Sequence, residues 1–399
     1  DGDGDLDLVV TSGGAEVEEG DALLQDRLYR NDGGRFVRAD GALPDVRTSS
    51  GRVAAADFDG DGDPDLVVCG RLVPGRYPDA PPTRLYANEG GRFVDVTAER
   101  AESLRTAGMA TDALWFDVDG DGDLDLVLAA HWQPIRILEN RPREDGAPDA
   151  GRVLVDATEA AGLAPHTGWW NALCAVDVDG DGDLDLLAGN HGWNTKYKAS
   201  PEHPARLFFG DFDQNGTRDL VEAKYEGDRL LPVRGRSCSS QAMPERAERF
   251  PTYARFAKSA LSDIYGEQLQ SCGQLAATEL ASCLLRNDGA GRFTVEPLPR
   301  RAQISPIFAF AVLGERVVCA QNHFAPEPET GRADGGTGLV LQRTAAGGLE
   351  VAPANVHGIV FAGDHKGLAV VRRGGRTEVV FARNDGPLHA WRLAAPPAK

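Results

Sequence analysis

The sequence contains no apolar run of about 18 or more residues, so it offers no candidate for a membrane-spanning helix. It is also short of basic side chains, because 42 Lys and Arg residues face 61 Asp and Glu residues, giving a formal net charge of -19. This balance argues against nucleic acid and against an anionic membrane surface as partners. The patterns GxxxxGKS/T, HExxH, GxSxG and CxxCH are missing as well. We therefore expect a binding protein in preference to an enzyme.

The six cysteines do not show the spacing of a disulfide framework. Three lie in apolar runs, where we expect small buried hydrophobic side chains: Cys69, Cys174 and Cys319. The others lie in or beside one irregular segment and could form one bridge, whose pairing the spacing leaves open: Cys238, Cys272 and Cys283.

An acidic motif recurs almost unchanged along the chain. It reads DFDGDGDPDL at 57–66 and DVDGDGDLDL at 117–126 and 177–186, with a divergent copy, DFDQNGTRDL, at 211–220. The chain opens inside a further copy, DGDGDLDL, without an initiator Met or a signal peptide. We therefore expect a processed chain or part of a longer one.

Each complete motif places oxygen-bearing side chains at positions 1, 3, 5 and 9 of a loop, with a glycine at position 6 where the chain turns sharply. Carboxylates this close repel one another unless a cation lies between them, and several oxygen ligands suit a hard cation. Calcium is the expected ion, because Mg²⁺ demands a strict octahedron and Zn²⁺ prefers His or Cys, which these loops lack. We expect four calcium sites and a further candidate in the incomplete first loop. The candidate ligands are Asp1, Asp3, Asp7, Asp57, Asp59, Asp61, Asp65, Asp117, Asp119, Asp121, Asp125, Asp177, Asp179, Asp181, Asp185, Asp211, Asp213, Asn215 and Asp219.

Two other interpretations fit a single copy of the motif. An acidic loop can be a solvated turn, but near-identical repetition disfavours that interpretation. The copy at 211–220, together with Glu222, also satisfies an EF-hand pattern. An EF-hand needs a helix on each side, whereas the flanking RLFFG and LVEAKY are typical of strands.

The spacing of the motifs indicates a repeat fold. Equivalent aspartates are 58, 60, 60 and 34 residues apart, short apolar runs flank each motif, and a hairpin of the LYRNDGGRFV type follows most of them. The two runs that flank each motif and the two strands of the hairpin give four strands per unit. We predict an all-β, seven-bladed β-propeller with calcium-binding hairpin loops, formed by residues 1–399, because closing the ring removes exposed sheet edges. The blades are expected to start near residues 1, 51, 111, 171, 206, 304 and 361.

Residues 226–282 interrupt the fifth unit as an insertion. Within it, 251–269 spaces its apolar side chains as on one face of a helix, which predicts an amphipathic helix in a partly helical insertion. The segment is expected either to pack as a lid over one face of the propeller or to provide a binding surface.

The acidic loop, followed by a strand and an NDGxGRF-type hairpin, resembles the FG-GAP or VCBS repeats of integrin alpha-chain propellers and of many bacterial surface proteins. From the fifth unit onward the chain is similar to bacterial FG-GAP proteins related to cartilage acidic protein. The resemblance implies a calcium-stabilised seven-bladed propeller used for adhesion or assembly. Because such loops usually require extracellular calcium concentrations, a secreted, cell-surface or periplasmic location is expected.

If the acidic loops lie at one end of each blade, the next connection lies at the other end, where polar and aromatic residues gather. We expect a partner or ligand face there, and its candidate residues are His131, Trp132, His191, Trp193, Tyr197, Arg234 and His323. The alternative is that these side chains cap blade ends and fill the channel. The favoured function is a protein-protein interaction module that docks another envelope or extracellular protein. The second is a glycan-binding propeller or a calcium-dependent polysaccharide lyase.

Overall fold

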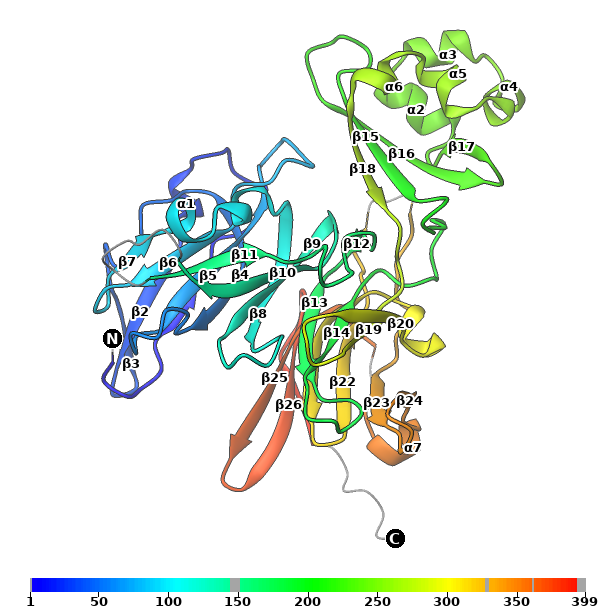
Figure 1. The fold of residues 1–399 in the computed structure, drawn as a ribbon. Helices are drawn as coiled ribbons and strands as arrows, with labels where there is room; N and C mark the ends of the chain where they lie inside the picture. Colours follow the sequence, from blue (N-terminus) through cyan, green and yellow to red (C-terminus); the bar gives the residue numbers. More distant parts are fainter. Residues whose placement is uncertain (1, 144–150, 327–329, 361, 393–399) are drawn as a thin grey trace.

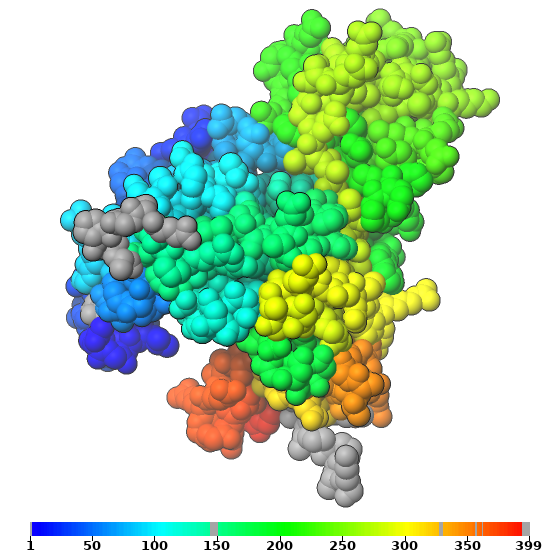
Figure 2. All heavy atoms as spheres, in the orientation of Figure 1, coloured from blue at the N-terminus to red at the C-terminus, as the bar shows by residue number. Residues whose placement is uncertain are grey.

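The computed structural model describes residues 2–143, 151–326, 330–360 and 362–392, and it is mostly β. Its strands form seven antiparallel sheets. Six of them follow one another and pack face to face, while the seventh stands apart with a group of short helices (Figure 1). Figure 2 shows the same lobe as a projection from the body of the molecule.

We number the six stacked sheets I to VI in chain order. Sheet I contains β1 (Leu8–Val10), β2 (Arg27–Asp32) and β3 (Arg35–Arg38). Sheet II contains β4 (Ser49–Ala56), β5 (Asp65–Leu72), β6 (Arg84–Asn88) and β7 (Phe93–Asp95). Sheet III contains β8 (Met109–Phe116), β9 (Asp125–Gln133), β10 (Arg136–Pro142), β11 (Arg152–Asp156) and the short β12 (Gly168–Trp169). Sheet IV contains β13 (Ala172–Val176), β14 (Asp185–Gly189), β19 (Cys283–Asn287) and β20 (Phe293–Pro297). Sheet V contains β21 (Ile307–Leu313), β22 (Arg316–Gln321), β23 (Leu339–Arg343) and β24 (Leu349–Val351). Sheet VI contains β25 (His365–Arg373), β26 (Arg376–Arg383) and β27 (His389–Trp391).

The remaining strands form the inserted sheet: β15 (Ala205–Gly210), β16 (Asp219–Glu226), β17 (Arg229–Pro232) and β18 (Gly273–Ala277). Its helices are α2 (Arg236–Ala242), α3 (Glu245–Arg249), α4 (Tyr253–Lys258), α5 (Leu261–Tyr265) and α6 (Gln268–Ser271). We call residues 205–277 the inserted lobe. The other short helices are η1 (Ala22–Leu24), α1 (Thr97–Arg100), η2 (Glu102–Thr106), η3 (Arg300–Gln303) and α7 (Ala354–His357).

The apolar runs that follow the acidic motifs become strands with both faces covered. Residues Asp65–Gly70 of β5 and all of β14 are buried, as are all of β22 and most of β9. A separate hydrophobic cluster fills the space between each pair of consecutive sheets from I to VI. Because neighbouring sheets contact both faces, these strands show continuous apolar runs instead of alternation.

The topology corrects the expected fifth blade. β19 pairs with β14, so hairpin 283–297 completes sheet IV, and the unit expected to start near residue 206 forms the inserted sheet instead. The insertion therefore begins before β15 and not at residue 226. The series of stacked sheets in the described chain numbers six, because the expected count of seven took the inserted sheet as a blade.

An asparagine shared by the hairpins explains why β19 belongs to sheet IV. The backbone N–H of Asn287 donates to Asp185 Oδ1 at 2.9 Å, as that of Asn140 donates to Asp125 Oδ1 at 2.8 Å in sheet III. The Asn287 side chain also donates to the carbonyl of Val118 in the neighbouring sheet at 2.8 Å. Each asparagine thus joins the third strand to its own acidic loop and, in sheets III and IV, to the preceding sheet.

The helical part of the insertion also differs from the expectation. The helix expected over 251–269 is divided into α4, α5 and the start of α6. Ser259 ends α4 in an extended conformation, and Gly266 ends α5 with φ 69°. The apolar spacing nevertheless marks a buried face, since Phe256, Leu261 and Ile264 all pack against the inserted sheet.

The predictions for the cysteines are confirmed only in part. Cys69 and Cys319 are buried in β5 and β22, as expected, and Cys174 is partly buried in β13. All six cysteines lie in described residues and none forms a disulfide. Cys283 packs in the core between sheets III and IV, so it belongs to the stacked body and not to the irregular segment.

We expect Asn287→Ala to lower the free energy of unfolding by about 1–3 kcal/mol, because the Val118 carbonyl loses a buried donor. Asn31→Ala is the matched control, since Asn31 has the same place in sheet I and, among the described residues, its side chain bonds only to the Gly34 N–H of its own turn. Urea unfolding of both variants measures the difference. Equal losses would show that the tie between sheets contributes little.

Candidate functional site

The acidic loops join the first and second strands of their sheets, as β4 and β5 are joined by residues 57–64. The position-1 aspartate organises each loop: Asp57 accepts the backbone N–H groups of Gly60, Asp61 and Gly62 at 2.8, 3.1 and 3.0 Å. Gly60 and Gly62 have φ 80° and 95°, which a glycine adopts without strain. Strands flank the divergent loop too, so the EF-hand interpretation is wrong.

Carboxylates converge in four loops of the described chain. In each group one oxygen from every member lies within 4.8 Å of the others. The groups are Asp57, Asp59 and Asp61; Asp117, Asp119 and Asp125; Asp177, Asp179 and Asp181; and Asp211, Asp213 and Asp219. The candidates outside these groups are Asp3, Asp7, Asp65, Asp121, Asp185 and Asn215, while Asp1 lies outside the described residues.

The position-9 aspartates have a structural role that the sequence interpretation missed. Asp65 Oδ2 accepts the backbone N–H of Phe58 at 3.1 Å, and its Oδ1 accepts that of Asn88 at 2.8 Å. Burial raises the pKa of Asp65 and of Asp125 to about 6. These carboxylates therefore fasten the loop to the third strand. The asparagine that recurs in each following hairpin was the available signal.

The acidic groups fit a hard cation on an observation independent of the motif. Asp59 Oδ1 is buried, with no hydrogen-bond partner among the described residues, and Asp59 belongs to the same acidic group as Asp57 and Asp61. Its other oxygen pairs with Arg100 at 2.7 Å, and Asp179 pairs with Arg286 at 2.6 Å. A buried acceptor without a donor is costly unless a cation or water satisfies it. Asp57, Asp59 and Asp61 would therefore supply the carboxylate oxygens for such an ion.

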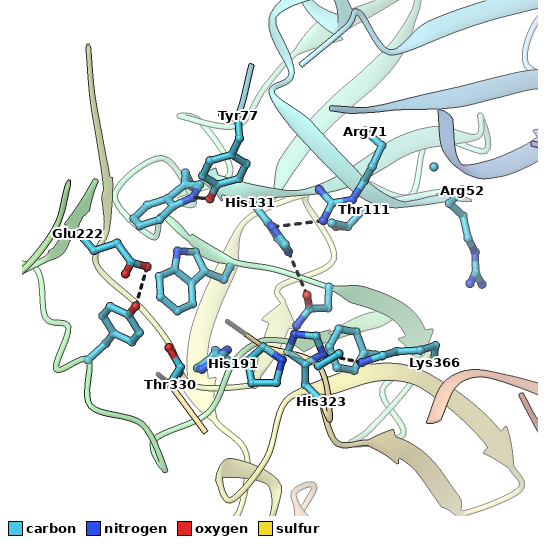
Figure 3. A pocket seen from close by; sticks show the side chains of 18 of the residues that line it. Arg52, Arg71, Tyr77, Thr111, His131, His191, Glu222, His323, Thr330 and Lys366 are labelled. Atoms are coloured by element: carbon cyan, nitrogen blue, oxygen red, sulfur yellow. Dashed lines mark hydrogen bonds between the residues drawn. The ribbon is translucent and has the colours of Figure 1, made fainter. Parts of the chain in front are cut away.

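A pocket lies at the opposite end of the sheets from the acidic loops. Its volume is about 790 Å³, and residues of sheets II to VI and of the inserted lobe line it (Figure 3). Six of the seven residues proposed for a partner face come together here: His131, Trp132, His191, Tyr197, Arg234 and His323. Trp193 does not. It is 49% exposed and lines a different hollow with Asn194 and Gln303.

Burial keeps the pocket histidines neutral near pH 7. It lowers the pKa of His131 to about 3 and that of His191 to about 4. Arg71 Nη2 lies 3.5 Å from His131 Nδ1, and His131 Nε2 lies 3.1 Å from Asn171 Oδ1. Because a guanidinium only donates, His131 accepts through Nδ1 and donates through Nε2.

Aromatic rings form one side of the pocket. Trp169 makes edge contacts with Trp132, His191 and Tyr197 at centroid distances of 5.1, 4.9 and 4.9 Å. Trp132 has φ 64°, a conformation rarely adopted by a bulky residue, and its indole N–H donates to the Tyr77 hydroxyl at 2.9 Å. This side is thus held by mutual packing.

Several lining residues were missed by the sequence interpretation, among them Arg71, Tyr77, Trp169, Glu222 and Lys366. The sequence did contain a signal for Arg71. Arg71 follows Asp65 by the same number of residues that separate His131 from Asp125 and His191 from Asp185. The repeat register therefore predicts its place, whereas the other four lie outside that register.

Comparison with known proteins supports the repeat interpretation. The family model described as FG-GAP-like repeat matches residues 1–68 and 117–188. These regions contain the near-identical acidic motifs at 57–66, 117–126 and 177–186 and the incomplete copy at the start of the chain. A search of curated proteins found no match. Among the described residues, no helix is long and apolar enough to cross a membrane.

Proposed function

From these FG-GAP-like repeats we propose that the chain is a calcium-stabilised β-propeller, with the six stacked sheets as its blades, that acts as an interaction module outside the cytoplasm. The observation that carries this proposal is the convergence of three carboxylates in each of four loops. Carboxylate oxygens without His or Cys suit Ca²⁺, and such loops are usually filled at extracellular calcium concentrations.

In this proposal calcium has a structural role. Each ion would hold a hairpin that also carries the position-9 aspartate, which is tied to the third strand. Stiff hairpins at one end of the blades hold the strands that end at the pocket. The partner is another extracellular or envelope protein, bound for adhesion or assembly at the pocket end.

A glycan ligand is the second candidate, and the form of the pocket favours it. A volume of about 790 Å³ lies within the range of small-molecule sites, roughly 300–1,000 Å³, and aromatic rings line one side. Lyase activity has less support. The lowered pKa of His191 makes it a poor base near neutral pH, and the Tyr197 hydroxyl donates to Glu222 Oε1 at 2.6 Å.

Calorimetric titration of the metal-free protein with Ca²⁺ tests the scaffold, and we expect four sites. Affinity isolation in calcium and in EGTA, with mass spectrometry of the retained proteins, tests the partner. A stoichiometric protein lost in EGTA supports the interaction module. Fewer than three calcium sites would contradict the scaffold, and unsaturated products from a polysaccharide panel, abolished by His191→Ala, would show a lyase.

A further inference from the structure

We infer that the pocket binds an oligosaccharide that carries carboxylate groups, and that Arg71 pairs with one of those carboxylates. The inference rests on the proposed role of the pocket end as the binding face, and it deepens the glycan candidate by naming the charge of the ligand and the residue that recognises it.

The first support is the charge balance of the lining. Four described lining residues are cations, and three of them pair with carboxylates. Arg52 Nε lies 3.1 Å from Asp112, Arg234 Nη2 lies 2.8 Å from Glu222, and Lys366 Nζ lies 2.7 Å from Asp364. Arg71 has no carboxylate partner in the described chain, and its Nη2 lies 3.5 Å from Nδ1 of the neutral His131. Among the described lining residues, Arg71 is thus the one cation whose charge no carboxylate offsets.

The second support is a pair of unused donors. Arg71 Nη1 and Trp169 Nε1 are both buried, and neither has a hydrogen-bond partner within the residues that the structure describes. Both side chains line the pocket. Buried donors are nearly always satisfied, by water if not by protein or ligand. A ligand that fits here therefore brings oxygen acceptors for an indole N–H and a guanidinium.

The third support is the distribution of side chains around the pocket. Arg52, Arg71 and Lys366 lie on one side of the view in Figure 3, and Glu222 lies on the other, beyond Tyr77. Trp169 makes edge contacts with Trp132 and with Tyr197. A sugar acid has a C–H face for aromatic rings, hydroxyl and ring oxygens for an indole N–H, and a carboxylate for a guanidinium.

A folded protein partner would contact the broad surface around the pocket, whereas the hollow itself, of about 790 Å³, has the size of a small-ligand site. An acidic peptide could supply the carboxylate. It is therefore a competing outcome of the test.

The test is calorimetric titration of the calcium-loaded protein with trigalacturonate, with its fully methyl-esterified form, with maltotriose and with triglutamate. The esterified trimer keeps the sugar rings and removes the charge. We expect trigalacturonate to bind at least tenfold more tightly than its ester, and more tightly than maltotriose and triglutamate.

Two variants assign the contacts. Arg71→Gln is expected to weaken trigalacturonate binding at least tenfold and to leave binding of the ester nearly unchanged. Trp169→Phe keeps an aromatic ring, removes the N–H, and is expected to weaken binding of both trimers. The control is Arg35→Gln, which makes the same change of charge at an exposed residue of sheet I, a sheet that contributes no lining residue. It is expected to bind like the wild type.

Each other outcome overturns the inference in a distinguishable way. Equal affinity for acid and ester would remove the role of charge while keeping a glycan site. Tighter binding of triglutamate would assign the pocket to acidic peptides. No binding of any trimer, with four calcium sites still measured, would reject the glycan candidate and leave the scaffold intact. If Arg71→Gln does not fold, Trp169→Phe and the comparison of acid with ester still decide the matter.

Discussion

Removal of calcium with EGTA lowers the melting temperature by on the order of 10 °C if all four acidic loops bind the ion. A site held at about 100 times its dissociation constant adds about 2.7 kcal/mol to the free energy of unfolding. Four such sites add about 11 kcal/mol, and each kcal/mol shifts the melting temperature by a degree or more in a chain of this size. Differential scanning calorimetry in calcium and in EGTA measures the shift.

A pair of variants in one loop separates ion binding from ordinary loop stability. Asp61 belongs to the acidic group of its loop, whereas the Asp63 side chain does not. Asp61→Asn keeps an oxygen that can accept the Asp63 N–H, a contact of 2.9 Å, and Asn215 occupies the same position in the divergent loop. We expect Asp61→Asn to reduce the stabilisation by calcium and to leave the melting temperature in EGTA unchanged or higher, since one repulsive charge is lost.

Asp63→Asn removes the same charge two residues away and is the matched control. We expect it to keep the full effect of calcium. A lower melting temperature for Asp61→Asn in EGTA, or equal behaviour of the two variants in calcium, would contradict the assignment of Asp61 as a ligand.

We expect removal of the inserted lobe to leave a folded protein with three calcium sites. Ala205 and Ala277 are paired in neighbouring strands, so a short glycine link can replace residues 206–276. The lobe has a hydrophobic cluster of its own, formed by the inserted sheet and its helices. Sheet IV keeps both of its hairpins. The loss of the loop at 211–219 is expected to lower the calorimetric calcium stoichiometry from four to three.

The control deletion removes residues 283–297. This hairpin places Cys283 and Leu285 in the core between sheets III and IV, and its loss is expected to prevent folding. The opposite pattern, with the lobe essential and hairpin 283–297 dispensable, would restore the lobe as a blade of the ring. Circular dichroism and protease resistance measure folding in both variants.

Local features of this protein could be predicted from its sequence. The acidic loops and the strands on either side of them depend on residues close together in the chain. The gathering of six candidate residues in one pocket was also predicted, because the repeat register places equivalent positions at the same end of each sheet.

Other features depended on contacts between distant parts of the chain. The pairing of β14 with β19 spans the whole inserted lobe, and the N–H of Asn287 that reaches Asp185 comes from 102 residues away. Asn287 at the end of β19 is a local signal for this pairing, but its contacts with Asp185 and Val118 appear only in the folded protein. Backbone hydrogen bonding between strands is the same for any sequence, so packing against sheet III and the contacts of Asn287 select the partner.

The sequence by itself therefore determined where the acidic loops and strands lie, since the spacing of aspartates and the apolar runs act over a few residues. The tertiary structure alone decided the membership of sheet IV and the division of the helix at 251–269. It also left Arg71 without a carboxylate partner among the described residues, while Arg52, Arg234 and Lys366 each have one. Burial and pairing of charge are properties of the assembled pocket, because its walls come from positions as far apart as Gly51 and Lys366.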